Sequence, residues 1–377
     1  MHQLRLLHAR ALWGPALLLV AALALGPVRS AQAQTGPSLR SVDRPIRVAL
    51  DPVYQSYEAS NGTVLNEAST YLTTSVPIGQ RFTAQARIGY AQMSVGDTPD
   101  VQGLTDATGR FLYSQPVGEG SVVIAANLNV PTGKQQLDAD AIRTTRFISR
   151  NYYDFQVSSF SRGLSVSPQV TWAFPVNDRL ALGVGAGYQY QRGYQPTQGL
   201  TSDSLYVPGD GIGANAGFDY KITETSALGV DLAVKRYQAD RLDGTRRFNA
   251  GNRYAGTLRY LNRSGFTTIR AVVRYASWEE SEFGYQVGDP DRGQVIPSHA
   301  MVLGSYKTRL SEVIDVRVRA SGHRYAETLQ ADAKTFGRLY VAPSFELTDE
   351  IVVSPHGTGT YGSFVGIGGG VRIEGRI

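Results

Sequence analysis

Three histidines, at positions 299, 323 and 356, could serve as general bases in an enzyme. A hydrolytic triad needs a nucleophile and an acid within hydrogen-bond reach of one imidazole. Ser298 adjoins His299 but falls on the opposite face of an extended segment. Asp315 shares a face with His323, but about 27 Å of strand separates them. We therefore predict that the chain is not an enzyme, although a triad drawn from neighbouring strands stays open as an alternative.

Two glycine-containing motifs could bind a metal ion or a nucleotide. The segment GDPDRG, residues 288–293, has carboxylates two positions apart, as calcium loops do, but it lacks the remaining ligands. The glycines at 366, 368 and 370 alternate within an extended segment, and no helix follows them as a nucleotide-binding loop requires. We predict an ordinary turn and a strand, and no metal or other cofactor.

Arginines supply the remaining chemistry, because a guanidinium group binds carboxylates and other anions. In the second half of the chain they recur at positions that share one face of extended segments. The eight that we predict to line the inside of a pore are Arg253, Arg259, Arg270, Arg274, Arg317, Arg319, Arg338 and Arg372. Such a set either forms structural salt bridges or selects anionic solutes.

The elements that must position these side chains are strands. The segment ALGVGAGYQYQ, residues 181–191, alternates apolar side chains with small or polar ones. Successive side chains of a strand point to opposite faces, so one face is apolar and the other is not. The same alternation recurs in segments 82–91, 122–130, 164–174, 212–220, 314–321 and 365–374.

Two kinds of connection join the alternating segments. Short ones occur at 76–81, 116–120, 175–179, 223–226, 262–265, 310–313 and 347–350. Longer, more variable ones occur at 95–102, 131–162, 192–208, 238–249, 279–297 and 326–333. Short turns at one end and longer loops at the other are typical of outer-membrane barrels. Hairpins at the short turns, with a first strand near 46–57 and a last near 364–376, predict about sixteen strands; fourteen stays possible.

A soluble β-sandwich also alternates, so the direction of the apolar face must be decided separately. Aromatic residues on that face gather near the short turns, at Phe82, Trp172, Phe174, Phe218, Tyr220, Tyr260 and Phe345. A second set lies toward the long loops, at Tyr90, Tyr188, Tyr190, Tyr237 and Tyr275. Two aromatic girdles match two membrane interfaces. We therefore predict an all-β fold, a closed antiparallel transmembrane β-barrel with short periplasmic turns and longer extracellular loops.

The amino terminus reads as a secretory signal peptide. Arg5 and Arg10 precede an apolar run over residues 11–25, and Ala31-Gln32-Ala33 has the small-x-small pattern of a cleavage site. We assign residues 1–33 to the signal, 34–45 to a short periplasmic segment and 46–377 to one barrel domain. Three arginines of the signal contribute to the formal charge of +5, so basicity gives no support to nucleic-acid binding. The absence of cysteine excludes a disulfide framework.

One stretch resembles a known family. Residues 103–134, GLTDATGRFLYSQPVGEGSVVIAANLNVPTGK, combine a G-L-x-D strand, a short turn, a second strand and a P-T-G-K exit. This pattern resembles bacterial outer-membrane proteins of the "meta-pathway of phenol degradation" transporter-like family, distantly akin to long-chain fatty-acid and aromatic-hydrocarbon channels. The resemblance implies an antiparallel barrel that passes hydrophobic or small organic solutes. The matching residues are Gly103, Leu104, Asp106, Pro131, Thr132, Gly133 and Lys134.

These observations predict a porin-like channel of a Gram-negative outer membrane, for passive or facilitated diffusion of small solutes that are hydrophobic, aromatic or anionic. Its partners would be outer-membrane lipid and the solute, with no nucleic acid; the sequence does not give the oligomeric state. The loop 131–162 is either a surface loop or a constriction, in which Asp138 and Asp140 face wall arginines. An outer-membrane enzyme of lipase or protease type and a structural or adhesive barrel with a plugged lumen remain as alternatives.

Overall fold

The computed structural model describes residues 45–134, 136–148, 152–195, 205–285 and 289–377. The predicted signal peptide and almost all of segment 34–45 lie outside these residues. No helix in the described part of the chain is long and apolar enough to cross a membrane.

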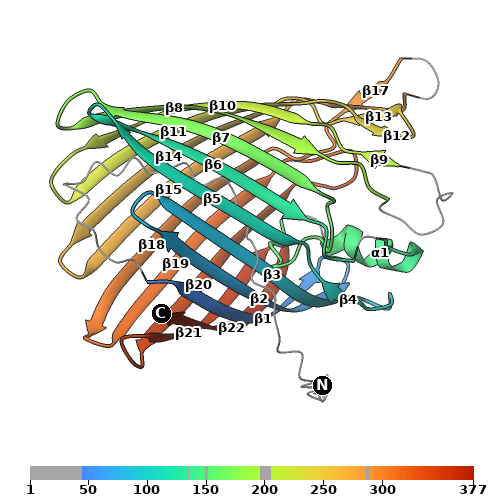
Figure 1. The fold of residues 1–377 in the computed structure, drawn as a ribbon. Coiled ribbons are helices and arrows are strands. Elements are labelled where there is room, and N and C mark those ends of the chain that lie inside the picture. The colour runs from blue at the N-terminus through green and yellow to red at the C-terminus, as the bar shows by residue number, and fades with distance from the viewer. Residues whose placement is uncertain (1–44, 135, 149–151, 196–204, 286–288) are drawn as a thin grey trace, which may run out of the picture.

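Sixteen antiparallel strands close into a barrel, as the hairpin count predicts (Figure 1). In order around the barrel they are β1 (Arg47–Ala59), β2 (Val64–Ile78), β3 (Phe82–Val95), β5 (Ala107–Val117), β6 (Gly120–Val130), β7 (Ser165–Pro175), β8 (Leu180–Gln191), β10 (Gly211–Lys221), β11 (Ser226–Tyr237), β14 (Arg253–Ser264), β15 (Thr267–Trp278), β18 (His299–Ser311), β19 (Ile314–Tyr325), β20 (Lys334–Glu346), β21 (Ile351–Gly362) and β22 (Phe364–Arg376). The short β4 (Val101–Leu104) continues the sheet beside β3.

The seam of the barrel joins its first and last strands. β1 pairs with β22 from Arg47 opposite Arg376 to Ala59 opposite Phe364. Ile46 and Ile377 exchange two backbone hydrogen bonds of 2.9 Å just beyond this register. Because every strand then has a neighbour on both sides, the barrel has no open edge, which a hydrocarbon environment requires.

The seven predicted short turns all lie at one end of the barrel, called here the turn end, and the six longer connections lie at the other, the loop end. Two connections at the loop end are also short. Residues 60–63 join β1 to β2, and Ser363 alone separates β21 from β22. Gly362 has a φ of 143°, a conformation that only glycine adopts readily, and it allows this tight turn.

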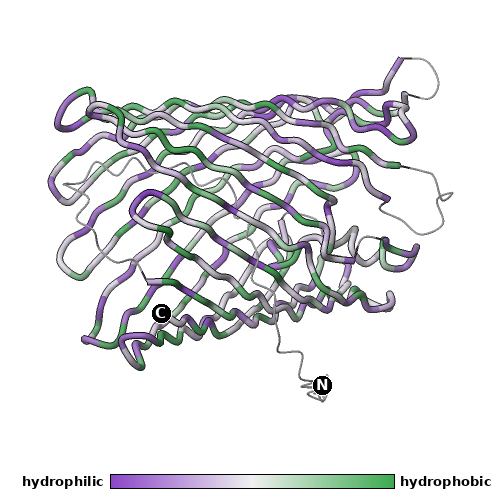
Figure 2. The backbone as a smooth tube through the Cα atoms, viewed as in Figure 1, coloured by the Kyte–Doolittle hydropathy of each residue, from purple (hydrophilic) through white to green (hydrophobic). Residues whose placement is uncertain are grey.

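The outer face of the barrel is apolar, and the hydropathy of each strand alternates along its length (Figure 2). Its exposed aromatic residues include Tyr54, Tyr90, Tyr188, Tyr190, Tyr254, Tyr275 and Tyr361 toward the loop end, and Tyr113, Trp172, Tyr220 and Tyr306 toward the turn end. The prediction for Tyr237 is wrong. Its ring points inward and stacks on Trp278 at 5.5 Å, because β11 places its odd positions on the lumen face.

Additional structure stands beyond the barrel at the loop end (Figure 1). One helix, α1 (Ala139–Ile148), contacts β3 and β4. A small sheet consists of β9 (Tyr206–Val207), β12 (Asp240–Leu242), β13 (Thr245–Asn249), β16 (Ser281–Phe283) and β17 (Asp291–Gly293). Within it, Tyr206 donates a hydrogen bond to Asp240. Burial and this carboxylate raise the pKa of Tyr206, so the phenol remains a donor at neutral pH.

Candidate pore and its constriction loop

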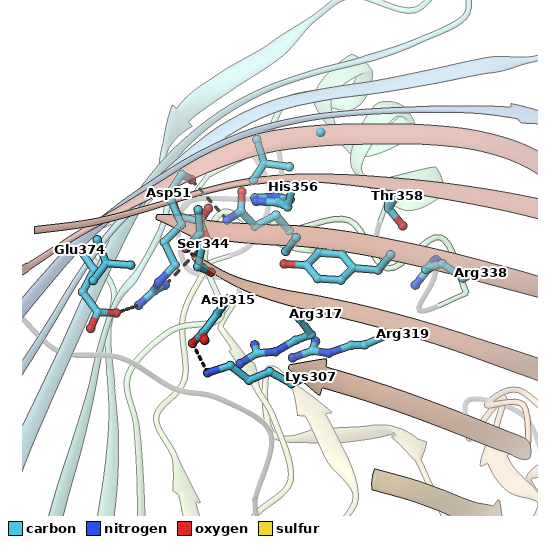
Figure 3. Close-up of a pocket in the computed structure, with 18 of the residues that line it drawn as sticks. Asp51, Lys307, Asp315, Arg317, Arg319, Arg338, Ser344, His356, Thr358 and Glu374 are labelled. Carbon is cyan, nitrogen blue, oxygen red and sulfur yellow. Dashed lines mark hydrogen bonds and ion pairs between the residues drawn. The ribbon is translucent and has the colours of Figure 1, made fainter. Parts of the chain in front are cut away.

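A cavity of about 820 Å³ lies in the lumen along β1 and β18–β22 (Figure 3). We call the inward-facing residues of β18–β22 the basic wall. Four of the eight singled-out arginines line this cavity: Arg317, Arg319, Arg338 and Arg372. Their strands pair directly or through one intervening strand, so alternation within each strand is what brings these side chains to one surface.

Acidic residues of the basic wall gather near the turn end, where they form ion pairs. Asp315 accepts from Lys307 at 2.6 Å and from Arg309 at 3.4 Å. Glu374 lies 3.2 Å from Arg372, and Arg376 lies 3.7 Å from Glu346. Arg372 is also 3.9 Å from Asp51 of β1, across the seam. This end of the wall is therefore a structural network with little excess charge.

Farther from the turn end than Asp315, Glu346 and Glu374, the inward positions of the basic wall include arginines and no further acid. Arg317 and Arg319 follow each other on the lumen face of β19. No ion pair of Arg317 is found among the described residues, and the guanidinium of Arg319 lies 5.2 Å from the Tyr340 ring centroid. On β3, the guanidinium of Arg87 lies 3.3 Å from the Tyr71 ring centroid and borders the same cavity. Arg87, Arg317 and Arg319 thus line this cavity from β3 and β19.

The other four singled-out arginines face the lumen from β14 and β15, beside this cavity rather than on it. Arg259 pairs with Asp231 at 2.9 Å and with Asp219 at 3.3 Å, so its charge is compensated. Arg253 lies with its guanidinium 5.4 Å from the Trp278 ring centroid. Arg270 and Arg274 occupy the lumen face of β15. The eight arginines thus divide between two stretches of wall with different partners.

The opposite side of the lumen is small and neutral. We call the inward residues of β7, β8 and β10 up to Gly217 the neutral wall; they are mainly glycine, serine, threonine and amides. A Cβ added to Gly185 would lie only 2.5 Å from Oδ1 of Asn215, so a larger residue would collide with its neighbour. Strand order places β7 and β8 across the barrel from β20 and β21.

The loop between β6 and β7 enters the lumen from the loop end. Its segment 152–160 contributes buried Tyr152, Tyr153, Phe155, Val157 and Phe160 to an apolar cluster. On the barrel side the cluster consists mainly of residues of β1, β2, β3, β19, β20 and β22: Tyr57, Leu65, Ala91, Met93, Val95, Tyr325, Phe336 and Phe364. The loop is therefore seated against the seam side of the barrel, next to the basic wall.

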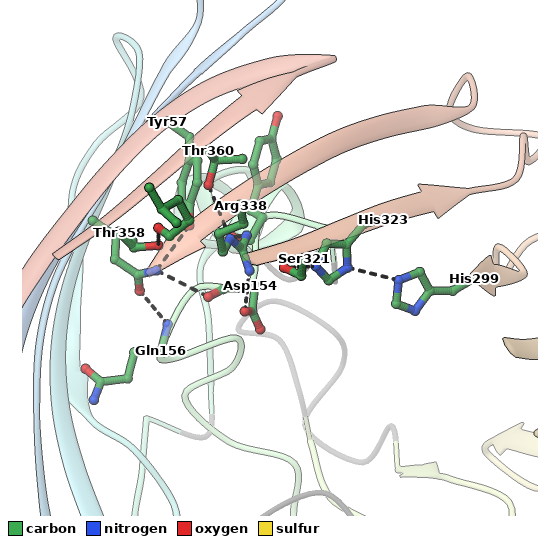
Figure 4. A network of polar contacts seen from close by, with 12 residues as sticks. Tyr57, Asp154, Gln156, His299, Ser321, His323, Arg338, Thr358 and Thr360 are labelled. Atoms are coloured by element: carbon green, nitrogen blue, oxygen red, sulfur yellow. Dashed lines mark hydrogen bonds and ion pairs between the residues drawn. The ribbon is translucent and has the colours of Figure 1, made fainter. Parts of the chain in front are cut away.

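Polar contacts hold the tip of this loop in place (Figure 4). Gln55 donates to the backbone oxygen of Asp154 and accepts from the backbone N–H of Gln156 at 2.8 Å. Arg338 donates to the carboxylate of Asp154 at 2.5 Å and to the backbone oxygen of Tyr153 at 3.0 Å. Glu67 is completely buried and accepts from the backbone N–H of Val157 at 3.0 Å. Since buried polar groups need partners, these bonds fix one loop position.

The base of the loop is anchored by the residues of the G-L-x-D and P-T-G-K motifs. The Asp106 carboxylate accepts from the backbone N–H of Gly133 at 3.2 Å, from that of Arg162 at 2.7 Å and from the Asn129 amide at 2.7 Å. Thr132 accepts from the N–H of Ala107 at 2.8 Å. A Cβ on Gly133 would lie 2.0 Å from a backbone oxygen. The motif clamps the two ends of the loop together, a role that the sequence alone did not reveal.

The two aspartates predicted for a constriction lie elsewhere on the same loop. Asp138 is exposed and caps α1, accepting from the N–H of Ala141 at 2.7 Å. Asp140 is exposed in the first turn of that helix. The acid that meets a wall arginine is Asp154, which the charge pattern did not distinguish from other loop acids.

The structure brings a serine and two histidines together near the loop end. Nε2 of His323 lies 2.9 Å from the Ser321 hydroxyl oxygen, and its Nδ1 lies 3.2 Å from Nε2 of His299. The enzyme alternative therefore has a serine–histidine pair. In the position where a catalytic triad has an acid, His323 has a second histidine, His299. The strand β19 is paired on both sides, so the backbone N–H groups of β19 are engaged in the sheet and do not form an oxyanion hole. His356 instead lies 5.7 Å from the Tyr340 ring centroid.

Part of the segment GDPDRG belongs to the small sheet at the loop end. Its residues Asp291–Gly293 form β17, and Asp291 pairs with Phe283. The described residues hold no group of three or more potential metal ligands.

A closed sixteen-stranded barrel with an apolar outer belt, a charged lumen and an inserted loop defines a porin-like transmembrane β-barrel of the outer-membrane type. No family model and no curated protein matches the chain. Solved structures do match. An outer-membrane channel from Pseudomonas putida F1 is similar at 12% identity and a TM-score of 0.40, over 91% of this chain and 99% of that one.

Two other solved structures have comparable likeness. An anion-selective porin from Comamonas acidovorans has 12% identity and a TM-score of 0.40, covering 88% of this chain and 98% of its own. The TodX monoaromatic hydrocarbon channel, in a deltaS2 mutant form, has 11% identity and a TM-score of 0.45, covering 89% and 91%. At these identities the likeness concerns the fold alone.

Proposed function

We propose that this protein is an outer-membrane channel through which small solutes diffuse passively, with a preference for anions. The observation that carries the proposal is the pair Arg317 and Arg319, which face a cavity of about 820 Å³ while the acids of the same wall are paired near the turn end. Charged side chains that line a pore select ions by sign. Outer-membrane lipid would cover the apolar belt, and the solute would enter from the loop end.

The mechanism follows from the asymmetry of the lumen. A row of guanidinium groups on one side and neutral residues on the other attracts an anion toward the basic wall. The seated loop narrows the entrance on that same side, so a solute passes within reach of the arginines. Each contact replaces part of the hydration shell of the anion without trapping it, because the groups are spread along the wall. We include in this proposal that the protein is related to the phenol-degradation transporter-like family, which residues 103–134 resemble.

Planar lipid bilayers test the proposal directly. Purified protein should insert and produce steps of current, and a potassium chloride gradient should give a zero-current potential of the sign that chloride permeation produces. The matched control is the double variant Lys307→Gln with Asp315→Asn, which removes the ion pairs of Asp315 with Lys307 and Arg309 without changing net charge. It should keep the same sign. Steps that select potassium over chloride would contradict the anion preference, and absence of steps would contradict the channel.

The apolar seat of the loop also favours a second candidate, a structural barrel whose lumen is plugged. Segment 152–160 buries five large apolar side chains inside the barrel, as a plug would. The two candidates differ in the same bilayer measurement, since a plugged barrel inserts without current steps.

The enzyme alternative rests on Ser321 and His323 and has its own test. Because His323 contacts His299 and Ser321, and no carboxylate among the described residues, we expect no hydrolysis of a p-nitrophenyl ester above the rate of the Ser321→Ala variant. A rate that this substitution abolishes would establish a catalytic serine.

A further inference from the structure

A flat aromatic surface lies on the lumen side of the barrel near the loop end. The rings of His299 and His323 are coplanar within 5° and joined edge to edge by the 3.2 Å contact between their nitrogens. Behind them, His299 stacks on Tyr325 at 4.0 Å, and His323 stacks on Phe336 at 4.8 Å, both nearly parallel. The four side chains therefore form two layers, of which the histidine layer is called here the imidazole platform.

The platform is held in one orientation. The Ser321 hydroxyl bonds Nε2 of His323, and the second layer is anchored in the cluster that seats the loop, where Phe336 lies 4.7 Å from Phe364. Tyr325 and Phe336 are buried, whereas both histidines are partly exposed. Both histidines are at inward positions of their strands, where side chains face the lumen. Their exposed surface is therefore exposed to the lumen. His323 also lines the cavity of the basic wall.

A cation stands beside the platform. Arg274 of β15 pairs in register with Met301 of β18, which pairs with His323 of β19. It therefore shares the lumen face with both histidines and lies one inward position from Ala276, the register partner of His299. No hydrogen bond or ion pair of Arg274 is found within the described part of the chain. On the other flank, Arg338 is occupied by Asp154 and the loop backbone.

From this juxtaposition we infer that the lumen contains a binding subsite for aromatic carboxylates, with the ring on the imidazole platform and the carboxylate on Arg274. Planar rings favour offset stacking on other rings, and a guanidinium matches a carboxylate with two parallel hydrogen bonds. A short aliphatic anion would use only the arginine, and an uncharged ring only the platform. The inference rests on the proposed channel function and names a class of solute for it.

Block of chloride current through single channels tests the subsite. Benzoate and cyclohexanecarboxylate have the same charge and similar size, but only benzoate is flat and aromatic. We expect benzoate to block at about threefold to tenfold lower concentration, the gain that a stacked aromatic pair provides. Equal blocking concentrations for the two anions would overturn the inference while leaving the channel function intact, whereas absence of any current would overturn the channel function itself.

Two variants of one position separate the ring from its hydrogen bonds. His323→Phe keeps a flat ring and should retain the preference for benzoate. His323→Gln keeps polar contacts but removes the ring, and should bring the two blocking concentrations together. Retention of the preference in His323→Gln would overturn the role of the platform.

Charge variants test the position of the carboxylate. Arg274→Gln should weaken block by both carboxylates to a similar extent, since both use this guanidinium. The matched control, Arg376→Gln, removes a charge from the same lumen but at the turn end, where Arg376 belongs to the ion-pair network with Glu346, and it should preserve the ratio of blocking concentrations and most of the block. A larger loss of block in Arg376→Gln than in Arg274→Gln would place the carboxylate elsewhere.

Discussion

The basic wall and the neutral wall face each other across one lumen but are built differently. The basic wall carries long charged side chains whose acids gather near the turn end, whereas the neutral wall carries small residues such as Gly183, Gly185 and Gly187. A symmetric ring of charge would hold an ion at the centre of a pore. Charge on one side instead guides it along a surface, with free space beside it.

The inserted loop adds to the same asymmetry. Its tip docks on the seam side, through Gln55, Glu67 and Arg338, and no hydrogen bond from residues 152–160 to the neutral wall is found in the described part of the chain. The free width of the lumen is therefore set by the loop on one side and by the absence of side chains on the other. We therefore expect substitutions in the neutral wall to change the stability of the barrel, and substitutions in the basic wall to change its ion selectivity.

The largest effect should follow from releasing the loop. Asp106→Ala removes the acceptor of three hydrogen bonds at the base of the loop. Leaving buried donors without partners costs about 1–3 kcal/mol for each group, so the loop should lose its seat. Single-channel conductance should rise, and proteases added to reconstituted vesicles should cleave within 131–162.

The control for this experiment is Asp138→Ala, on the same loop. It removes only the cap of α1, worth about 1 kcal/mol, and should leave conductance unchanged. If Asp106→Ala behaves like this control, the clamp does not hold the loop.

An intermediate effect is expected from filling the neutral wall. Gly185→Val would force a side chain against Asn215 and Thr171, and overpacking of this kind costs about 1–3 kcal/mol. The variant should unfold at lower urea concentration in detergent micelles. Gly183→Ala is the matched control, because the atom nearest to its Cβ would be 3.9 Å away. Equal destabilisation of both variants would show that space at Gly185 is not the cause.

A smaller effect is expected from removing charge on the basic wall. Arg317→Gln with Arg319→Gln should lower the ratio of chloride to potassium permeability roughly fivefold, which corresponds to about 1 kcal/mol of electrostatic attraction in a wet lumen. The zero-current potential in a salt gradient measures this ratio. An unchanged ratio would mean that anions do not travel along this wall.

Most of the fold could be predicted from alternation and turns. Segments such as 181–191 have one apolar face, and the turns 175–179 and 223–226 mark where the chain reverses. These signals are local, and each strand repeats them. The prediction for Tyr237 was wrong because it departed from the alternation of its own strand, in which Tyr237 occupies the same face as Asp231 and Lys235.

The site was harder to predict because its contacts join distant segments. Asp154 and Arg338 meet at 2.5 Å although 184 positions separate them in the chain. Asp106 belongs to the G-L-x-D motif, which is recognisable in the sequence. Its role depends on where the two ends of the loop lie in space, which the sequence does not give. The sequence shows that Ser321 and His323 lie on the same face of one strand, and that His299 lies on the inward face of another. It does not show which positions of the two strands lie opposite each other, because that depends on the pairing of β18 with β19.

The seat of the loop has a consequence for the order of assembly. Tyr57 of β1 contacts Phe364 of β22 at 5.7 Å, and Tyr153 of the loop packs on both rings. The complete seat therefore exists only when the first and last strands have met. We expect full docking of the loop to follow closure of the barrel rather than precede it.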